Sequence, residues 1–132
     1  MMIDLVDVSS LKHIEGFSQK RVEWLREKIV AEKIWKKPIA LDSQHGLVLD
    51  GQHRMEVALA LRLDRVPAVR FLYEELTVWS LRPATHEVTW QLVVERALSG
   101  QIYPYKTVKH SFPNQFPSCS YSLKRLGFEP GQ

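Results

Sequence analysis

The segment LVLDGQHRMEVALAL, residues 47–61, constrains the fold of this chain more than any other stretch. It passes from a short apolar run through Asp50 and Gly51 into a run rich in alanine and leucine. This pattern predicts a buried strand over 47–49, a tight turn, and a helix over 52–63. A strand that turns at once into a helix leaves several backbone N–H groups without partners at the start of that helix.

The side chains at this junction suit an anion. Unpaired N–H groups and the helix dipole attract negative charge, and Gly51 lets a ligand approach the backbone closely. Arg54 can donate two parallel hydrogen bonds to a phosphate, and His53 can donate one more. Asp50 fits such a site if Mg²⁺ lies between its carboxylate and the phosphate. The structural alternative makes Asp50 a helix N-cap and the residues after it a solvated first turn.

The remaining predicted elements alternate without a regular strand–helix–strand rhythm. Ser18 is expected to cap the helix that follows the loop LKHIEGF, and Gly100 to end the last helix. We predict strands over 3–8, 38–42, 66–72 and 76–81, and helices over 19–34 and 88–99. Residues 101–132 contain four prolines and show little periodicity, so we expect that tail to be functional or disordered. These elements predict an α+β fold with a small mixed β-sheet packed with helices.

Composition bounds the class of protein. A chain of 132 residues with 45% hydrophobic and 25% charged residues is expected to form one domain over 1–132. No apolar run reaches the roughly 18 residues that span a bilayer, and the chain starts with acids instead of the basic head of a secretion signal. A single cysteine, Cys119, cannot form an internal disulfide. We therefore expect a cytoplasmic protein without a membrane partner.

The charge is unevenly distributed along the chain. Residues 1–100 hold 14 basic and 14 acidic side chains, whereas residues 101–132 hold four basic side chains against Glu129 alone. The net charge of +3 therefore comes from the last quarter of the chain. Proteins that coat DNA usually present a broad basic face, so nucleic acid is not an expected partner. A small anion site and a solvated basic tail are both compatible with this distribution.

A second concentration of polar residues lies in IYPYKTVKHSFP, residues 102–113. Lys106 can neutralise phosphate charge, the Thr107 hydroxyl can donate to a phosphate, and His110 can donate or carry a proton. The alternative is a basic loop packed by its own aromatic side chains. Arg82 is a weaker candidate for binding a substrate carboxylate, because an ordinary arginine at a strand end explains it too. The four tryptophans are expected in the core or at an interface, which allows a homodimer without requiring one.

The sequence Asp-Gly-Gln-His-Arg between a strand and a helix, followed by LRLDRVPAV, resembles the motif of the ParB N-terminal/sulfiredoxin-like superfamily. In members of that superfamily this turn binds nucleotide phosphates. Sulfiredoxins read Gly-Cys-His-Arg with the cysteine as nucleophile, whereas here that position is Gln52 and Cys119 lies 67 residues later. Partition ParB proteins read Gly-Glu-Arg-Arg and continue into helix-turn-helix modules, and this sequence has neither feature.

The free L-serine kinase branch of the superfamily is more similar. It typically reads Asp-Gly-His-His-Arg, with a glutamate before the first helix and a later Pro-x-Lys-Thr-x-x-His. This sequence has Glu15 in LKHIEGF and PYKTVKH at 104–110, so the three motifs follow in the same order over residues 11–113. It departs from the branch at Gln52, which replaces the first histidine, and in its shorter chain.

The resemblance implies a small-molecule kinase that transfers a phosphoryl group from ATP or ADP to the hydroxyl of a free amino acid, above all L-serine, giving O-phospho-L-serine. The implied catalytic residues are Glu15 as general base, Asp50 as Mg²⁺ ligand, and His53. The implied phosphate-binding residues are Gly51, Gln52, His53, Arg54, Lys106, Thr107 and His110. The choice between ATP and ADP stays open. Two other classes also stay open: a regulatory module that binds nucleotide without turnover, and a DNA-binding partition-type protein.

Overall fold

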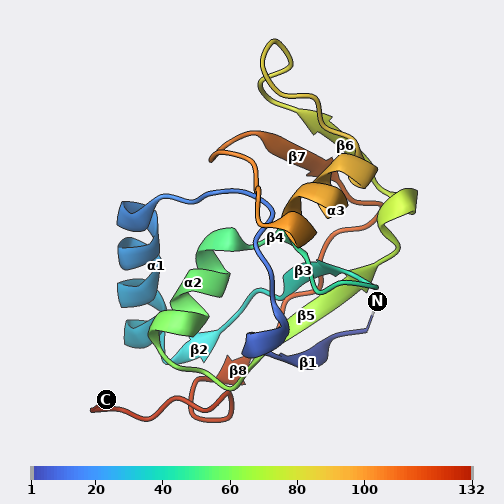
Figure 1. Cartoon of the computed structure of the whole chain (residues 1–132). Coiled ribbons are helices and arrows are strands. Elements are labelled where there is room, and N and C mark those ends of the chain that lie inside the picture. Colours follow the sequence, from blue (N-terminus) through green and yellow to red (C-terminus); the bar gives the residue numbers. More distant parts are fainter. Residues whose placement is uncertain (1, 132) are drawn as a thin grey trace.

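The computed structural model describes residues 2–131 (Figure 1). The helices are α1 (Gln19–Glu32), α2 (Gln52–Ala60) and α3 (Trp90–Ser99), with 3-10 turns η1 (Val8–Ser10) and η2 (Tyr73–Glu75). The strands are β1 (Asp4–Asp7), β2 (Ile34–Trp35), β3 (Ile39–Asp42), β4 (Val48–Asp50), β5 (Arg65–Phe71), β6 (Thr77–Ser80), β7 (Val108–Ser111) and β8 (Tyr121–Ser122).

A mixed four-stranded sheet with the order β1-β5-β3-β4 forms the centre of the fold. β3 and β5 run parallel, while β1 pairs with β5 and β4 pairs with β3 in the antiparallel sense. Ala68 of β5 lies between Asp4 on one side and Ile39 on the other. Two further antiparallel pairs, β6 with β7 and β2 with β8, complete the described strands. The predicted α+β fold with a small mixed sheet is confirmed.

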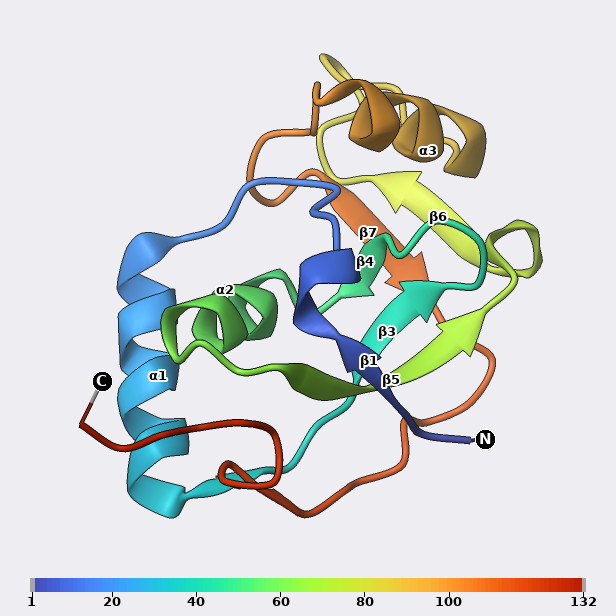
Figure 2. The same cartoon turned by 60° about the horizontal axis from the view of Figure 1, so that its bottom comes forward.

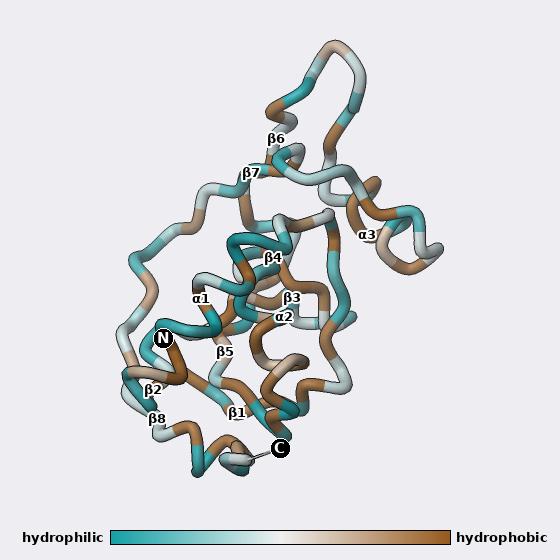
Figure 3. The backbone as a smooth tube through the Cα atoms, turned by 90° about the vertical axis from the view of Figure 1, so that its left-hand side faces the viewer, coloured by the Kyte–Doolittle hydropathy of each residue, from teal (hydrophilic) through white to brown (hydrophobic). Residues whose placement is uncertain are grey.

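Apolar side chains cover both faces of the central sheet. Because successive strand residues point to opposite faces, Ile39 and Leu41 enter one core cluster with residues of α1 and α2, while Ala40 enters the other. The second cluster also contains Val93 of α3 and Val108 of β7. Figure 2 shows α1 and α2 side by side at one end and α3 beside β6 and β7 at the other. In Figure 3, hydrophobic stretches of the backbone lie around β3, along α2 and in α3.

The helix ends follow from the capping residues. The Ser18 side chain accepts a hydrogen bond from the Arg21 N–H, which confirms the predicted cap of α1. α1 ends two residues earlier than predicted, because Lys33 adopts a left-handed conformation with a φ of 61°. Gly100 ends α3 with a φ of 80°, as predicted.

The tail after Gly100 differs most from the sequence prediction, because it is folded against the rest of the chain. Tyr103 and Leu126 are almost completely buried, and β7 pairs with β6 in the antiparallel sense. Of the two alternatives for this segment, functional or disordered, disorder is therefore wrong. Its order comes from contacts with distant strands, which a scan for local periodicity does not detect. Within residues 2–131, no helix has both the length and the apolar character needed to cross a bilayer.

Candidate functional site

The turn between β4 and α2 presents free backbone donors. Gly51, with a φ of 117°, is the N-cap of α2, and the first intrahelical bond runs from the Met55 N–H to its carbonyl. Within residues 2–131, the N–H groups of Gln52, His53 and Arg54 donate no hydrogen bond. The alternative in which Asp50 caps the helix is wrong, because this residue precedes the N-cap. The turn therefore has the donors and the dipole orientation that suit an anion.

Arg54 holds the turn against the neighbouring backbone. Its Nη1 donates to the Pro38 carbonyl at 2.9 Å, and its Nη2 lies 3.3 Å from Asp50 Oδ2. Burial lowers the pKa of the guanidinium from its ordinary value, and the Asp50 charge opposes that shift. The Asp50 side chain is half exposed, so its carboxylate is accessible from solvent. A Cβ on Gly51 would lie 3.2 Å from Ile39 Cγ1 and 3.4 Å from Arg54 Nη2, so the turn has little room for a larger residue.

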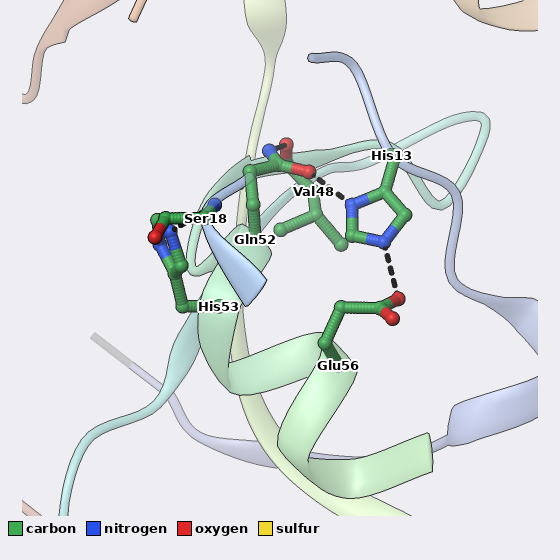
Figure 4. A network of polar contacts seen from close by, with 6 residues as sticks. All are labelled: His13, Ser18, Val48, Gln52, His53 and Glu56. Atoms are coloured by element: carbon green, nitrogen blue, oxygen red, sulfur yellow. Dashed lines mark hydrogen bonds and ion pairs between the residues drawn. The ribbon is translucent and has the colours of Figure 1, made fainter. Parts of the chain in front are cut away.

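Gln52 points its side chain away from these donors, into a chain of hydrogen bonds (Figure 4). Its Nε2 donates to the Val48 carbonyl, and its Oε1 lies 2.6 Å from Nδ1 of His13. The Nε2 of His13 lies 2.7 Å from a carboxylate oxygen of Glu56. The side chain of His13 is only 15% exposed, so these contacts lie in a largely buried position. Both the oxygen and the nitrogen of the Gln52 amide thus form hydrogen bonds inside the protein, and these bonds stabilise the turn.

His53 is held in one orientation by its neighbours. Its Nε2 accepts a hydrogen bond from the Ser18 N–H at 3.1 Å, and its ring meets Phe17 and Tyr105 edge to face. Burial lowers the pKa of His53, with Arg21 acting in the same direction. The ring is therefore neutral at pH 7, with its proton on Nδ1. Within residues 2–131 this Nδ1–H has no hydrogen-bond acceptor, so it is a free donor beside the turn.

Glu15 reaches the segment at 104–108 from the other end of the sequence. Its Oε2 accepts hydrogen bonds from the backbone N–H groups of Thr107, at 3.0 Å, and Val108, at 2.9 Å. Its Oε1 accepts no hydrogen bond from residues 2–131. Burial raises the pKa of Glu15, although the two N–H groups and the charge of Arg82 oppose the shift. One oxygen is therefore fixed, and the other is available to take a proton.

Arg82 supports this segment through the backbone. Its Nη2 donates to the Tyr105 carbonyl at 2.8 Å, and its Nε lies 3.4 Å from the Lys106 carbonyl. Lys106 adopts a left-handed conformation with a φ of 59°, and its exposed ammonium lies 5.4 Å from the centroid of the Tyr105 ring. Arg82 thus orders the loop that holds Glu15 through Nε and Nη2. Its binding to a substrate carboxylate stays a prediction.

Thr107 and His110 are engaged inside the chain. The Thr107 side chain is fully buried, and its hydroxyl donates to the Pro104 carbonyl at 2.7 Å. The Nε2 of His110 lies 2.8 Å from the Tyr73 hydroxyl. Burial lowers the pKa of His110 to about 4, with Lys109 acting in the same direction, so this imidazole is neutral at pH 7. Burial also raises the pKa of Tyr73, which keeps its hydroxyl protonated. Tyr73 carries no motif and could not have been identified from the sequence.

A groove of about 790 Å³ brings most of the predicted residues together. The predicted site residues that line this groove are Glu15, Asp50, Gly51, Gln52, His53, Arg54, Lys106 and His110. Thr107 and Arg82 do not line it. One wall continues along α1 from Arg21 to Glu32 and on to Lys37. Within residues 2–131, no three His, Cys, Asp or Glu side chains are grouped to hold a metal ion. A cation at Asp50 would take its other ligands from water or a bound phosphate.

No protein-family model and no curated protein sequence matches this chain. Several solved structures share its fold, among them the following three. A conserved hypothetical protein from Pyrococcus furiosus is 15% identical, with 96% of this chain and 97% of that one covered and a TM-score of 0.85. A free serine kinase in complex with AMP is 16% identical, with 94% and 93% covered and a TM-score of 0.84. The protein SbnI with a C-terminal truncation, from Staphylococcus aureus, is 13% identical, with 95% and 89% covered and a TM-score of 0.83. The chain therefore has, over nearly its whole length, the fold of a nucleotide-bound free serine kinase.

Proposed function

We propose that this protein is a small-molecule kinase, which transfers a phosphoryl group from ATP or ADP to the hydroxyl of a free amino acid, with L-serine as the first substrate to test. The observation that carries the proposal is the environment of the Glu15 carboxylate. This carboxylate is anchored through one oxygen, leaves the other free, and lines the same groove as the N-terminus of α2. The fold shared with a free serine kinase bound to AMP supports the same reading.

The donor phosphates bind at the start of α2. The N–H groups of Gln52, His53 and Arg54 donate to phosphate oxygens, and Nδ1–H of His53 supplies a further donor. Lys106, which is exposed and lines the same groove, adds the positive charge that the transferring group needs. Phosphoryl transfer depends mainly on such positioning and charge stabilisation, so a rigid turn is well suited to it.

Glu15 acts as the general base. The substrate hydroxyl oxygen attacks the terminal phosphorus, and its proton passes to Oε1 of Glu15 as the new phosphorus–oxygen bond forms. The bond from that phosphorus to the bridging oxygen breaks, and ADP leaves when ATP is the donor, or AMP when ADP is the donor. The raised pKa of Glu15 makes the carboxylate a stronger base than an exposed glutamate. Thr107 contributes through its backbone N–H, which holds the other oxygen in place.

Asp50 is the residue that would hold Mg²⁺. Its half-exposed carboxylate borders the groove beside the free N–H groups. One carboxylate together with substrate phosphates is a common donor set for Mg²⁺, so the residues present fit this ion. When bound, Mg²⁺ would neutralise phosphate charge. Asp50 also orients Arg54 through their ion pair.

The test is phosphorus NMR of the protein with Mg²⁺, either ATP or ADP, and a panel of free hydroxy amino acids that includes L-serine. We expect a phosphomonoester signal with at least one pairing, and its loss in the variant Glu15→Gln. The exposed residue Glu23 of α1 gives the matched control, Glu23→Gln, which should turn over as the wild type does. Nucleotide binding without product from any pairing would overturn the kinase proposal and favour a regulatory module.

A further inference from the structure

We propose that the α1 wall of the groove binds the nucleoside of the donor, with the indole of Trp24 as the surface on which the nucleobase stacks. This inference rests on the proposed function, because it assigns a place to the part of the nucleotide that does not react. Trp24 lines the groove and is 58% exposed, whereas Trp35 in the same wall is 1% exposed. Trp24 is thus absent from the core, and its ring is accessible to a planar ligand.

The side chains around Trp24 form one stripe that begins near the phosphate turn. Arg21, Trp24 and Lys28 follow at i, i+3 and i+7, so they lie on one face of α1. Arg21 is close enough to His53 to lower its pKa. At 1.5 Å of rise per residue, Lys28 lies roughly 10 Å further along the helix than Arg21. The ammonium of Lys28 lies 5.4 Å from the centroid of the Trp24 ring. Along the groove, the cation of Arg21 is thus followed by the aromatic ring of Trp24 and then by the cation of Lys28.

The chemistry of transfer sets the direction in which the nucleoside extends. The attacking and leaving oxygens lie on opposite sides of the phosphorus, roughly in line. Glu15 lies on the acceptor side, because it is the proposed base for the substrate hydroxyl. Its carboxylate is held there by the backbone N–H groups of Thr107 and Val108. The nucleoside must therefore lead away from this segment. In Figure 1, α1 starts near the loop before β7 and runs away from it toward β2. Trp24 is one of the α1 residues that line the groove.

Stacking of a base on an aromatic side chain predicts the size of the effect. Measured by alanine substitution, one such contact changes affinity by about 5- to 150-fold. Trp24→Ala is thus expected to weaken ADP binding by at least about fivefold. Trp24→Phe, which retains a ring, should recover most of the affinity. Inorganic pyrophosphate has no base, so Trp24→Ala should leave its binding unchanged.

The experiment is titration calorimetry of the wild type, Trp24→Ala and Trp24→Phe with ADP and with pyrophosphate. Trp79 of β6 is 40% exposed and does not line the groove, so Trp79→Ala is the matched control and should bind ADP as the wild type does. Equal ADP affinity of wild type and Trp24→Ala would overturn the inference. So would an equal loss of ADP and pyrophosphate binding. If the wild type binds ADP through Trp24 but phosphorylates no acceptor, the inference stands and the kinase proposal fails. If the wild type binds no nucleotide, both fail.

Discussion

The hydroxyl of Thr107 provides a test that separates a structural contact from a ligand contact. The residue lies in the motif PYKTVKH, where the sequence predicts a phosphate donor, yet its hydroxyl donates to the Pro104 carbonyl in a fully buried position. In the variant Thr107→Val, a methyl replaces the hydroxyl with almost no change in shape, while the backbone N–H that binds Glu15 remains. The variant therefore removes one hydrogen bond and little else.

The expected cost follows from these contacts. Loss of a neutral hydrogen bond to a partly buried carbonyl costs about 1–2 kcal/mol, and the additional buried methyl offsets up to about 0.8 kcal/mol of this. The net destabilisation is therefore about 1 kcal/mol, which for a chain of 132 residues lowers Tm by about 3–5 °C. Urea denaturation followed by circular dichroism measures the free energy of unfolding directly. The exposed Thr77 of β6 gives the control Thr77→Val, which should change stability by less than about 0.5 kcal/mol.

The ligand measurement distinguishes the two roles of the hydroxyl. If the hydroxyl binds only Pro104, ADP affinity in Thr107→Val stays within about twofold of the wild type. A hydroxyl that donates to a charged phosphate contributes about 1.5–3 kcal/mol, so its loss would weaken ADP binding by about 10- to 150-fold. Unchanged stability together with such a loss of affinity would refute the structural reading of Thr107.

Three further variants test the turn and the base. Glu15→Gln is expected to lower kcat by about 10²–10⁴-fold with ADP affinity unchanged, as measured by steady-state kinetics and calorimetry. Because burial raises its pKa in the folded state, Glu15 contributes stability below its unfolded pKa and loses it as pH rises through the folded value. Urea unfolding at a series of pH values should therefore show Glu15→Gln gaining stability over the wild type toward neutral pH. Gly51→Ala forces a positive φ on alanine and should cost about 1–2 kcal/mol of unfolding free energy. Arg54→Lys cannot bind Pro38 and Asp50 together, so ADP binding should weaken by at least about fivefold in calorimetry.

The elements around the β4–α2 turn were predictable because their signals are local. The apolar run of β4, the glycine at Gly51 and the periodicity of α2 all lie within one short segment. β7 was missed for the opposite reason: VKHS has no strong alternation, and the strand is defined by its pairing with β6 about thirty residues earlier. Tyr103 and Leu126 likewise owe their burial to partners distant in sequence.

The candidate site was predictable by residue type but not by contact. Glu15 and Thr107 were both candidates, yet no sequence pattern indicates that the backbone of one binds the carboxylate of the other across 92 positions. Trp24 was expected in the core or at an interface, and its exposure on the groove became apparent only from the packing of α1. Residue type thus indicates which groups can react, whereas the tertiary fold decides which of them have free atoms.

Gln52 shows why a departure from a motif need not change the chemistry of a turn. A side-chain amide carries a donor and an acceptor together, so it can serve the Val48 carbonyl and an N–H of His13 at the same time. A leucine would serve neither group, and a glutamate would set a carboxylate against the carbonyl. The Nε2 of His13 lies 2.7 Å from a carboxylate oxygen of Glu56, and this contact extends the support to the next turn of α2. The Gln52 amide binds Val48 and His13 and does not contact the donors at the start of α2. Replacing the first histidine of Asp-Gly-His-His-Arg therefore leaves those backbone donors, the free Nδ1–H of His53 and the guanidinium of Arg54 in place. The kinase proposal depends on those groups and on Glu15, and the side chain at position 52 enters it only by keeping the turn rigid.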